Sequence, residues 1–330
     1  MRALLAALLL LPVLPAPGAH AQPAEAAVIT EWVVPWPDSR PRDPIVDAQG
    51  HVWFVGQRAD YVARLDPASG EFERFDLQDG AGPHNVIVGP DGALWYAGNT
   101  AAHIGRLDPE TGEITRFPTP EDRARDPHTL IFDPDGRLWF TAQGANHVGR
   151  MDPATGEVEL AAMPVERARP YGIVVAPDGT PWVAAFGTNR LVAVDPETLA
   201  LRDYVLPRED ARPRRLAVTS DGAVWYVDYA GGHLGRLDPA TGDVEEWALP
   251  GGADTRPYAM AADDRDRLWF FETGKNPNRL VGFDPPTETF IEGPAPESGG
   301  GTVRHMVYDP ASRSLWFGTD TNTIGRATLR

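Results

Sequence analysis

The chain has 330 residues, 42% of them hydrophobic, and a formal net charge of −17 at pH 7. This length and hydrophobic content predict a large folded core and exclude general disorder, and the negative charge argues against binding to nucleic acid or to anionic membrane surfaces. The absence of cysteine excludes disulfides, thiolate catalysis and thiolate metal sites.

The first 21 residues have the features of a secretory signal peptide. Arg2 gives a positively charged start, residues 4–14 are almost wholly apolar, and Ala19-His20-Ala21 forms a small-x-small cleavage site. The apolar run is too short to span a bilayer, and no later segment approaches the ~18 consecutive apolar residues of a membrane helix. We therefore expect a periplasmic or secreted protein without membrane insertion, whose residues 22–330 form the mature domain.

A tryptophan-centred unit repeats along the rest of the chain at intervals of 42 to 47 residues. Each unit reads as four short strands, and the turn between the first two is commonly Asp-Gly, where glycine tolerates the positive φ of a tight hairpin. Four strands per ~43 residues, without helical periodicity, predict one blade of a β-propeller. The repeated tryptophans are Trp53, Trp95, Trp139, Trp182, Trp225, Trp269 and Trp316.

The two ends of the chain indicate how the ring closes. The last unit stops at residues 324–330 with a third-strand pattern, and Val28 to Val34 resembles the fourth strands of the other units. We therefore predict a single all-β domain over residues 22–330, a seven-bladed β-propeller of four-stranded blades. The N-terminal strand completes the last blade, which leaves no exposed sheet edge. We expect the tryptophans to pack between blades.

One position in each unit, eleven residues before the tryptophan, opens the innermost strand and is expected to face the mouth of the central channel. Counted in equal steps, these ring residues are Arg42, His84, His128, Tyr171, Arg214, Tyr258 and His305. A lone histidine there would be read as a half-buried residue bonded to a loop. Three at equivalent positions favour a site, so His84, His128 and His305 are candidate catalytic bases.

Arginine is concentrated around the same positions, which predicts a cationic mouth on an acidic protein. Guanidinium groups suit carboxylate, sulfate and phosphate, so we expect an anionic small ligand. Arg40, Arg212 and Arg256 follow an aspartate by two residues and are open to local neutralisation, whereas Arg42 and Arg214 have no acid at that spacing. The expected ligand-binding residues are Arg42, Tyr171, Arg214, Tyr258 and Arg304, with Glu272 and Asp228 as weaker acidic candidates.

Two motifs resemble the blades of the streptogramin (virginiamycin B) lyase family. They are Arg-Pro-Tyr-Gly-Ile followed by Pro-Asp-Gly and Trp (residues 169–182), and Gly-Ala-Asn-His-Val-Gly-Arg (residues 144–150). The resemblance extends over residues 28–330. It implies a seven-bladed propeller that opens the cyclic depsipeptide of type B streptogramins by elimination, using a magnesium ion.

The resemblance also implies a site on the last two blades. The family has a histidine at the start of the sixth inner strand, Glu-Pro-His at the seventh, and a later glutamate. Here these positions hold Tyr258, Val303-Arg304-His305 and Thr319. His305 therefore matches the histidine, but valine and threonine supply no carboxylate for Mg²⁺, a cation that commonly binds through one or two carboxylates.

A similar arrangement occurs on the second and third blades. His84 is followed in the next unit by Asp126-Pro127-His128, which places Asp126 as a candidate metal ligand, while the later acidic position is Ala142.

Three functions remain open from the sequence. The first is a lyase-like enzyme acting on a depsipeptide or carboxylate-bearing ligand, and the second is a non-catalytic propeller that binds an anionic small molecule, a saccharide or a protein. A lactonase of the gluconolactonase type is a minor alternative, because those propellers have six blades and use calcium. We expect a monomer.

Overall fold

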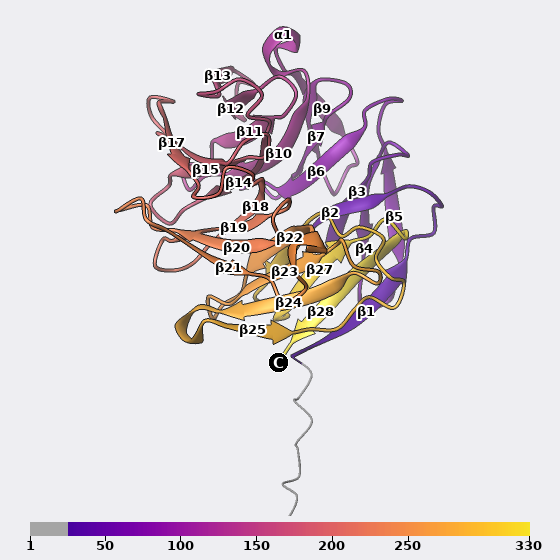
Figure 1. Cartoon of the computed structure of the whole chain (residues 1–330). Helices are drawn as coiled ribbons and strands as arrows, with labels where there is room; N and C mark the ends of the chain where they lie inside the picture. The colour runs from indigo at the N-terminus through magenta and orange to yellow at the C-terminus, as the bar shows by residue number, and fades with distance from the viewer. Residues whose placement is uncertain (1–25) are drawn as a thin grey trace, which may run out of the picture.

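The computed structural model describes residues 26–330, so the predicted signal peptide (1–21) lies outside the described residues. Seven antiparallel four-stranded sheets are arranged in a ring (Figure 1). The innermost strand of each sheet contacts the innermost strands of the two neighbouring sheets, all the way round. The predicted all-β, seven-bladed propeller is therefore confirmed.

The strands follow the chain order from the inside of each blade to the outside. Blade one comprises β2 (Pro41–Val46), β3 (Val52–Gly56), β4 (Tyr61–Leu65) and β5 (Phe72–Asp76). Blade two comprises β6 (Pro83–Val88), β7 (Leu94–Gly98), β8 (His103–Leu107) and β9 (Ile114–Pro118). Blade three comprises β10 (Pro127–Phe132), β11 (Leu138–Ala142), β12 (His147–Met151) and β13 (Val158–Ala162). Blade four comprises β14 (Pro170–Val175), β15 (Pro181–Ala185), β16 (Arg190–Val194) and β17 (Leu201–Val205).

The remaining blades repeat this order, except that the last is closed by the start of the chain. Blade five comprises β18 (Pro213–Val218), β19 (Val224–Asp228), β20 (His233–Leu237) and β21 (Val244–Ala248). Blade six comprises β22 (Pro257–Ala262), β23 (Leu268–Glu272), β24 (Arg279–Asp284) and β25 (Thr289–Glu292). Blade seven comprises β26 (Met306–Asp309), β27 (Ser314–Gly318), β28 (Thr323–Leu329) and β1 (Ala27–Val33). The helical segments are short, namely α1 (Glu121–Ala124), η1 (Ala253–Thr255) and η2 (Pro285–Thr287).

Ring closure depends on β1, which pairs antiparallel with β28 from Ala27–Leu329 to Val33–Thr323. The two ends of the chain therefore share one sheet, as the sequence predicts. Trp32 of β1 stacks on Trp316 of β27 with ring centroids 5.4 Å apart. The last blade thus gains both a hydrogen-bonded fourth strand and an aromatic contact from the N-terminal segment.

The repeated tryptophans are buried and pack between neighbouring blades. Trp53 of blade one, for example, shares an apolar cluster with Val86, Leu94 and Tyr96 of blade two. Its indole N–H donates to Asp47 in the first hairpin of its own blade, at 2.8 Å. Trp53 thus ties its hairpin to an interblade core, and the shared packing between blades explains why tryptophan recurs once per blade.

None of the helices among the described residues has the length and apolar character needed to cross a membrane.

Candidate functional site

The site is built where the chain enters the innermost strand of each blade. In six blades this strand starts with a proline, which suits a strand's first residue because proline offers no N–H to the ladder. The pairing with the second strand is then irregular within the next few residues, as between Arg42 and Ile45. Bulges of this kind redirect side chains, and the residue after each proline points to one end of the channel, called the mouth here.

The residues after the six prolines lie close together at the mouth. The ring centroids of His84 and His128 are 3.5 Å apart, and those of His128 and Tyr171 are 4.2 Å apart. The hydroxyls of Tyr171 and Tyr258 are hydrogen-bonded to each other. The Arg214 guanidinium carbon lies 3.7 Å from the Tyr258 ring centroid. The structure therefore brings together these predicted ring residues.

The equal-step count fails in the seventh blade. In blades one to six the ring residue lies three positions before the residue that pairs with the blade's tryptophan, as Arg42 lies before Ile45. In blade seven Trp316 pairs with Val307, so the equivalent position is Arg304, not His305. The β26–β27 hairpin is one residue longer than the others, which shifts the count. The expectation that His305 belongs to the ring is wrong, and the ring is completed by Arg304.

His305 belongs instead to a second layer, one residue deeper in the channel, called the inner tier here. Its members each follow a ring residue and are Asp43, Asn85, Thr129, Gly172, Arg215, Ala259 and His305. At Gly172 an added Cβ would lie 2.8 Å from the carbonyl oxygen of Arg214, so this blade leaves no room for a side chain beside Arg215.

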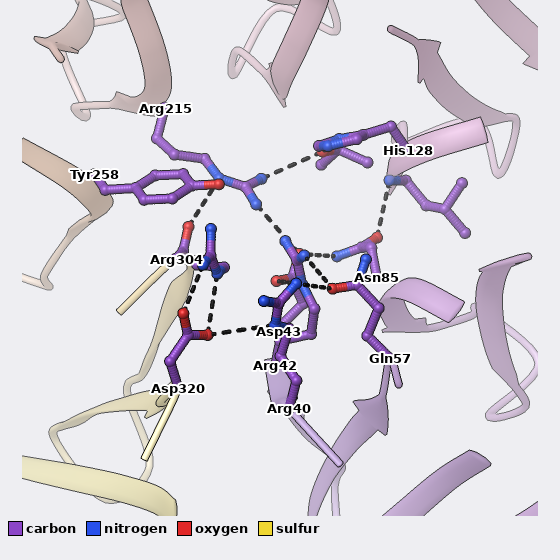
Figure 2. Close-up of polar contacts among 12 residues, drawn as sticks. Arg40, Arg42, Asp43, Gln57, Asn85, His128, Arg215, Tyr258, Arg304 and Asp320 are labelled. Carbon is purple, nitrogen blue, oxygen red and sulfur yellow. Dashed lines mark hydrogen bonds and ion pairs between the residues drawn. The ribbon is translucent and has the colours of Figure 1, made fainter. Parts of the chain in front are cut away.

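An ion pair crosses the channel at the inner tier (Figure 2). Asp43, which is fully buried, lies 3.2 Å from Arg215 of blade five and 3.0 Å from its neighbour Arg42. The amide of Asn85 also donates to Asp43, at 3.3 Å. Arg215 further donates to the hydroxyl of Thr129 at 3.3 Å. These contacts close the channel below the ring.

Asp43 gives Arg42 an acidic partner, although Arg42 has no aspartate at the Asp-x-Arg spacing. The carboxylate that pairs with Arg42 is the next residue in the chain. Asp43 has a positive φ of 48°, a region that aspartate tolerates better than most residues. An aspartate directly after a ring arginine was the only sequence signal for this contact.

The charges of the inner tier change the pKa values around it. Burial alone would raise the pKa of the Asp43 carboxyl, but the charges of Arg42, His305 and Arg215 outweigh it and hold the pKa well below its usual range. Burial, reinforced by the nearby Arg42 and Arg215, lowers the pKa of His84 and His128 well below 6.5 and that of His305 to about 4. All three imidazoles are therefore neutral at pH 7.

The tyrosine pair is affected in opposite directions. Burial raises the pKa of Tyr258 to about 12, and the neighbouring Tyr171 adds to this. For Tyr171 the charges of Arg214, Arg42 and Arg215 overcome burial and lower the pKa to about 8. The two hydroxyls form one hydrogen-bonded unit, with Tyr171 as its more acidic member.

Several polar nitrogen atoms at the mouth are buried without a hydrogen-bond partner among the described residues. They include Nε of Arg214, Nη2 of Arg42 and the Nδ1 atom of His84. Arg214 has no carboxylate partner among residues 26–330. Its guanidinium carbon lies instead among aromatic rings, 4.4 Å from the ring centroid of Tyr229 and 4.6 Å from that of Phe186. An unpaired guanidinium flanked by π faces is suited to an anion that the protein does not itself supply.

The other arginines of the mouth have different partners from those predicted. None of the Asp-x-Arg pairs forms an ion pair among the described residues. Arg40 lies 3.6 Å from Asp320, which also pairs with Arg304 at 2.6 Å. Arg212 donates to the backbone carbonyls of Glu209 and Ala211.

The acidic candidates Asp228 and Glu272 are fully buried and have partners within or beside their own blades. Asp228 accepts from the backbone N–H groups of Arg212 at 2.7 Å and Ala230 at 3.0 Å, and also pairs with Arg208. Glu272 pairs with Arg279 at 2.7 Å. Their oxygens hold loops and strands together, which gives both carboxylates a structural use.

The residues present do not fit a magnesium ion. Val303 lies in a hydrophobic cluster, and the hydroxyl of Thr319 is hydrogen-bonded to that of Thr323 at 2.8 Å. Asp126 accepts from the backbone N–H groups of Gly144 and of Ala145, the latter at 3.0 Å. Within residues 26–330, as far as their side chains are described, no three His, Asp or Glu residues come together as metal ligands.

Known proteins share the sequence pattern and the fold of this chain. The model of the virginiamycin B lyase family matches residues 27–327. The chain belongs to that family. A solved streptogramin B lyase is 26% identical, with a TM-score of 0.83, over 92% of this chain and 98% of that one.

More distant structures share the fold of this member of the virginiamycin B lyase family. The virginiamycin B lyase of Staphylococcus aureus is 23% identical, with a TM-score of 0.84, over 92% of this chain and 100% of that one. The hydrazine synthase of Kuenenia stuttgartiensis is 14% identical, with a TM-score of 0.72, over 88% and 96%. No protein of the curated set matches the chain.

The chain keeps the scaffold of the virginiamycin B lyase family. By its own strand register, Arg304 takes the mouth position of blade seven and Tyr258 takes that of blade six. A cationic and a phenolic side chain therefore occupy the mouth on the last two blades.

Proposed function

We propose that this protein is a lyase-like enzyme that acts on a carboxylate-bearing ester or depsipeptide at the mouth without a metal ion. The observation that carries the proposal is the Arg214 guanidinium, which has no carboxylate partner among residues 26–330. It donates to the Tyr171 hydroxyl at 3.5 Å and is held among aromatic rings, at the same mouth as two neutral histidines. Family membership supports the elimination chemistry, and the missing carboxylates support its independence from metal.

The mouth offers the groups that an elimination needs. His84, neutral and with a free Nδ1, is positioned to accept the proton from the carbon beside a carbonyl. The electron pair left on that carbon moves toward the carbonyl oxygen as an enolate, which the guanidinium of Arg42 or Arg214 stabilises. When the pair returns, a carbon–carbon double bond forms and the neighbouring carbon–oxygen bond breaks, which releases the ester oxygen as a carboxylate.

Fixed guanidinium charges are a physical substitute for a metal here. An enolate needs positive charge near its oxygen. Arg42 and Arg214 place N–H donors there and, unlike a metal ion, need no carboxylate ligands from the seventh blade. Arg42 is held by its ion pair with Asp43, and Arg214 is held among aromatic rings, so little reorganisation is required when negative charge develops.

The test uses quinupristin, the compound named in the structure of a catalytically inactive Staphylococcus aureus virginiamycin B lyase. Elimination gives a ring-opened product of unchanged mass, whereas hydrolysis adds one water, so mass spectrometry separates the two reactions. We expect the unchanged-mass product to form in excess EDTA. His84→Gln should lower turnover by about 10²-fold or more. The matched control is His51→Gln, because His51 bonds to Asp47 outside the ring.

Non-catalytic capture of an anion is the second candidate. It is favoured by the close packing of the ring, since His84, His128 and Tyr258 are each at most 5% exposed. In that case N-dansylglycine, which carries one carboxylate, binds at the mouth and is recovered unchanged. Arg214→Gln should weaken this binding at least tenfold, whereas Arg74→Gln, which changes the net charge equally but lies on β5, should not.

Export remains part of the proposal, and it rests on the signal-peptide features of residues 1–21.

A further inference from the structure

A second cavity lies on the other side of the inner tier from the mouth. It has a volume of about 560 Å³ and is lined by residues from the inner strands of all seven blades. Its wall is almost entirely aliphatic, with Ile173, Leu216, Met260 and Met306 among the lining side chains. The last residues of the inner strands, such as Val46 and Val88, are partly exposed, so this chamber opens at the far end of the channel.

The inner tier separates this chamber from the mouth. Asp43 bonds to Arg42 and, across the channel, to Arg215, and these three residues do not line the chamber. Any ligand of the chamber therefore enters from the end opposite the arginines. The chamber is a distinct site and does not depend on the proposed lyase function.

Two side chains of the lining, His305 at the inner end and Tyr308 further along the same segment, have a buried polar atom without a hydrogen-bond partner among the described residues. Asn85 and Thr129, which also line it, are already bonded to Asp43 and Arg215 respectively. His305 makes no hydrogen bond to any described residue, and its Nδ1 is buried without a partner. A neutral imidazole at the end of an aliphatic chamber can bond to one hydroxyl, amide or carbonyl group of a ligand.

We propose that the chamber binds a neutral, mostly apolar small molecule that presents one hydrogen-bonding group to His305. The volume lies within the range of small-molecule sites, which are mainly apolar with few polar groups. The lining contains no formally charged carboxylate, lysine or arginine, so a charged ligand would lose its hydration without a compensating partner. The apolar wall offers few hydrogen bonds to water in the chamber, so displacement of that water by an apolar occupant is favourable.

The first measurement uses N-phenyl-1-naphthylamine, a neutral probe whose fluorescence rises in apolar surroundings. We expect saturable binding of one probe per chain. Ala261→Trp places a large side chain on the chamber wall and should weaken binding at least tenfold. Val205→Trp is the matched control, since Val205 is 58% exposed on β17 and does not line the chamber. If Ala261→Trp does not melt cooperatively, Ala262→Leu replaces it.

The second measurement tests the role of His305. Displacement of the probe should favour 1-naphthol over naphthalene about five-fold, as one added hydrogen bond predicts. His305→Phe should abolish this preference while the probe still binds.

Three results would overturn the proposal. They are absence of saturable binding to the natural chain, equal binding by Ala261→Trp and Val205→Trp, and loss of binding in Arg214→Gln, which would place the probe at the mouth. Because Arg214→Gln is expected to impair the mouth but spare the chamber, failure of one proposal is distinguishable from failure of the other.

Discussion

Asp43 is held between Arg42 of blade one and Arg215 of blade five. Arg215 lies 172 residues from Asp43 in the sequence. All three side chains are at most 5% exposed. Removing one member of such a group leaves the others as uncompensated buried charges, which is a larger effect than the loss of the attraction itself.

We expect Asp43→Asn to lower the free energy of unfolding by about 3 kcal/mol or more, because Arg42 and Arg215 would lose their only shared carboxylate. Urea unfolding at pH 7 measures this. Glu73→Gln is the control, since Glu73 forms a surface pair with Arg64 and is 49% exposed. The control should lose at most ~1 kcal/mol, and an equal loss in both variants would contradict the role given to Asp43.

The buried histidines predict a loss of stability in mild acid. The pKa of His305 is lowered from 6.5 to about 4 by burial, so the unfolded chain takes up a proton before the folded chain does. The free energy of unfolding is therefore unaffected by the titration of His305 above pH 6.5. It decreases as the pH falls from 6.5 toward 4, by up to about 3 kcal/mol for this residue. Urea midpoints between pH 7 and 4 should fall less steeply in His305→Gln than in the natural chain. Equal slopes would show that His305 is not held neutral.

The longer first hairpin of blade seven explains why the predicted ring residue of that blade was wrong by one position. The six other inner strands reach their tryptophan after a hairpin of constant length, so a count from the tryptophan finds the right residue. In blade seven, Asp309 pairs with Ser314 around a longer turn, and the count falls on His305 in place of Arg304. One signal in the sequence marks the difference, namely the spacing of 47 residues before Trp316.

The closing strand β1 can be tested through Trp32. This half-buried side chain stacks on Trp316, and the Arg326 guanidinium lies 5.3 Å from its ring. Trp32→Ala should lower the free energy of unfolding by about 2 to 3 kcal/mol through lost burial and stacking. Val33→Ala changes the next residue of the same strand, which is 73% exposed, and should change stability by less than ~0.5 kcal/mol. A similar loss in both variants would argue against this closing contact.

At the scale of the whole molecule, the repeated pattern was sufficient to predict the architecture. Strand period, turn residues and buried tryptophans are local features, and each blade repeats them, so the blade number and the closure by β1 followed from the sequence. Contacts across the channel are not local. Asp43 pairs with Arg215, and four aromatic rings surround Arg214. Both arrangements depend on the way in which extended side chains from different blades meet at the axis.

The same distinction between local and overall charge leads to a prediction about salt. The chain has a formal net charge of −17, while the mouth gathers several guanidinium groups, of which Arg214 has no carboxylate partner among the described residues. An approaching anion is therefore repelled by the molecule as a whole and attracted within a few ångströms of Arg214. The Debye length is about 30 Å at 0.01 M salt, about 10 Å at 0.1 M and about 3 Å at 1 M, so the long-range repulsion is screened first.

We therefore expect the association rate of N-dansylglycine with the mouth to rise between 0.01 and 0.1 M salt and to fall again toward 1 M. Stopped-flow fluorescence measures the rate, with Arg214→Gln as the background for binding elsewhere. A rate that falls steadily from the lowest salt would mean that the cationic mouth dominates the field at all distances. A rate that only rises would mean that the guanidinium groups contribute little attraction, and the anion site would then be lost along with the mechanism built on it.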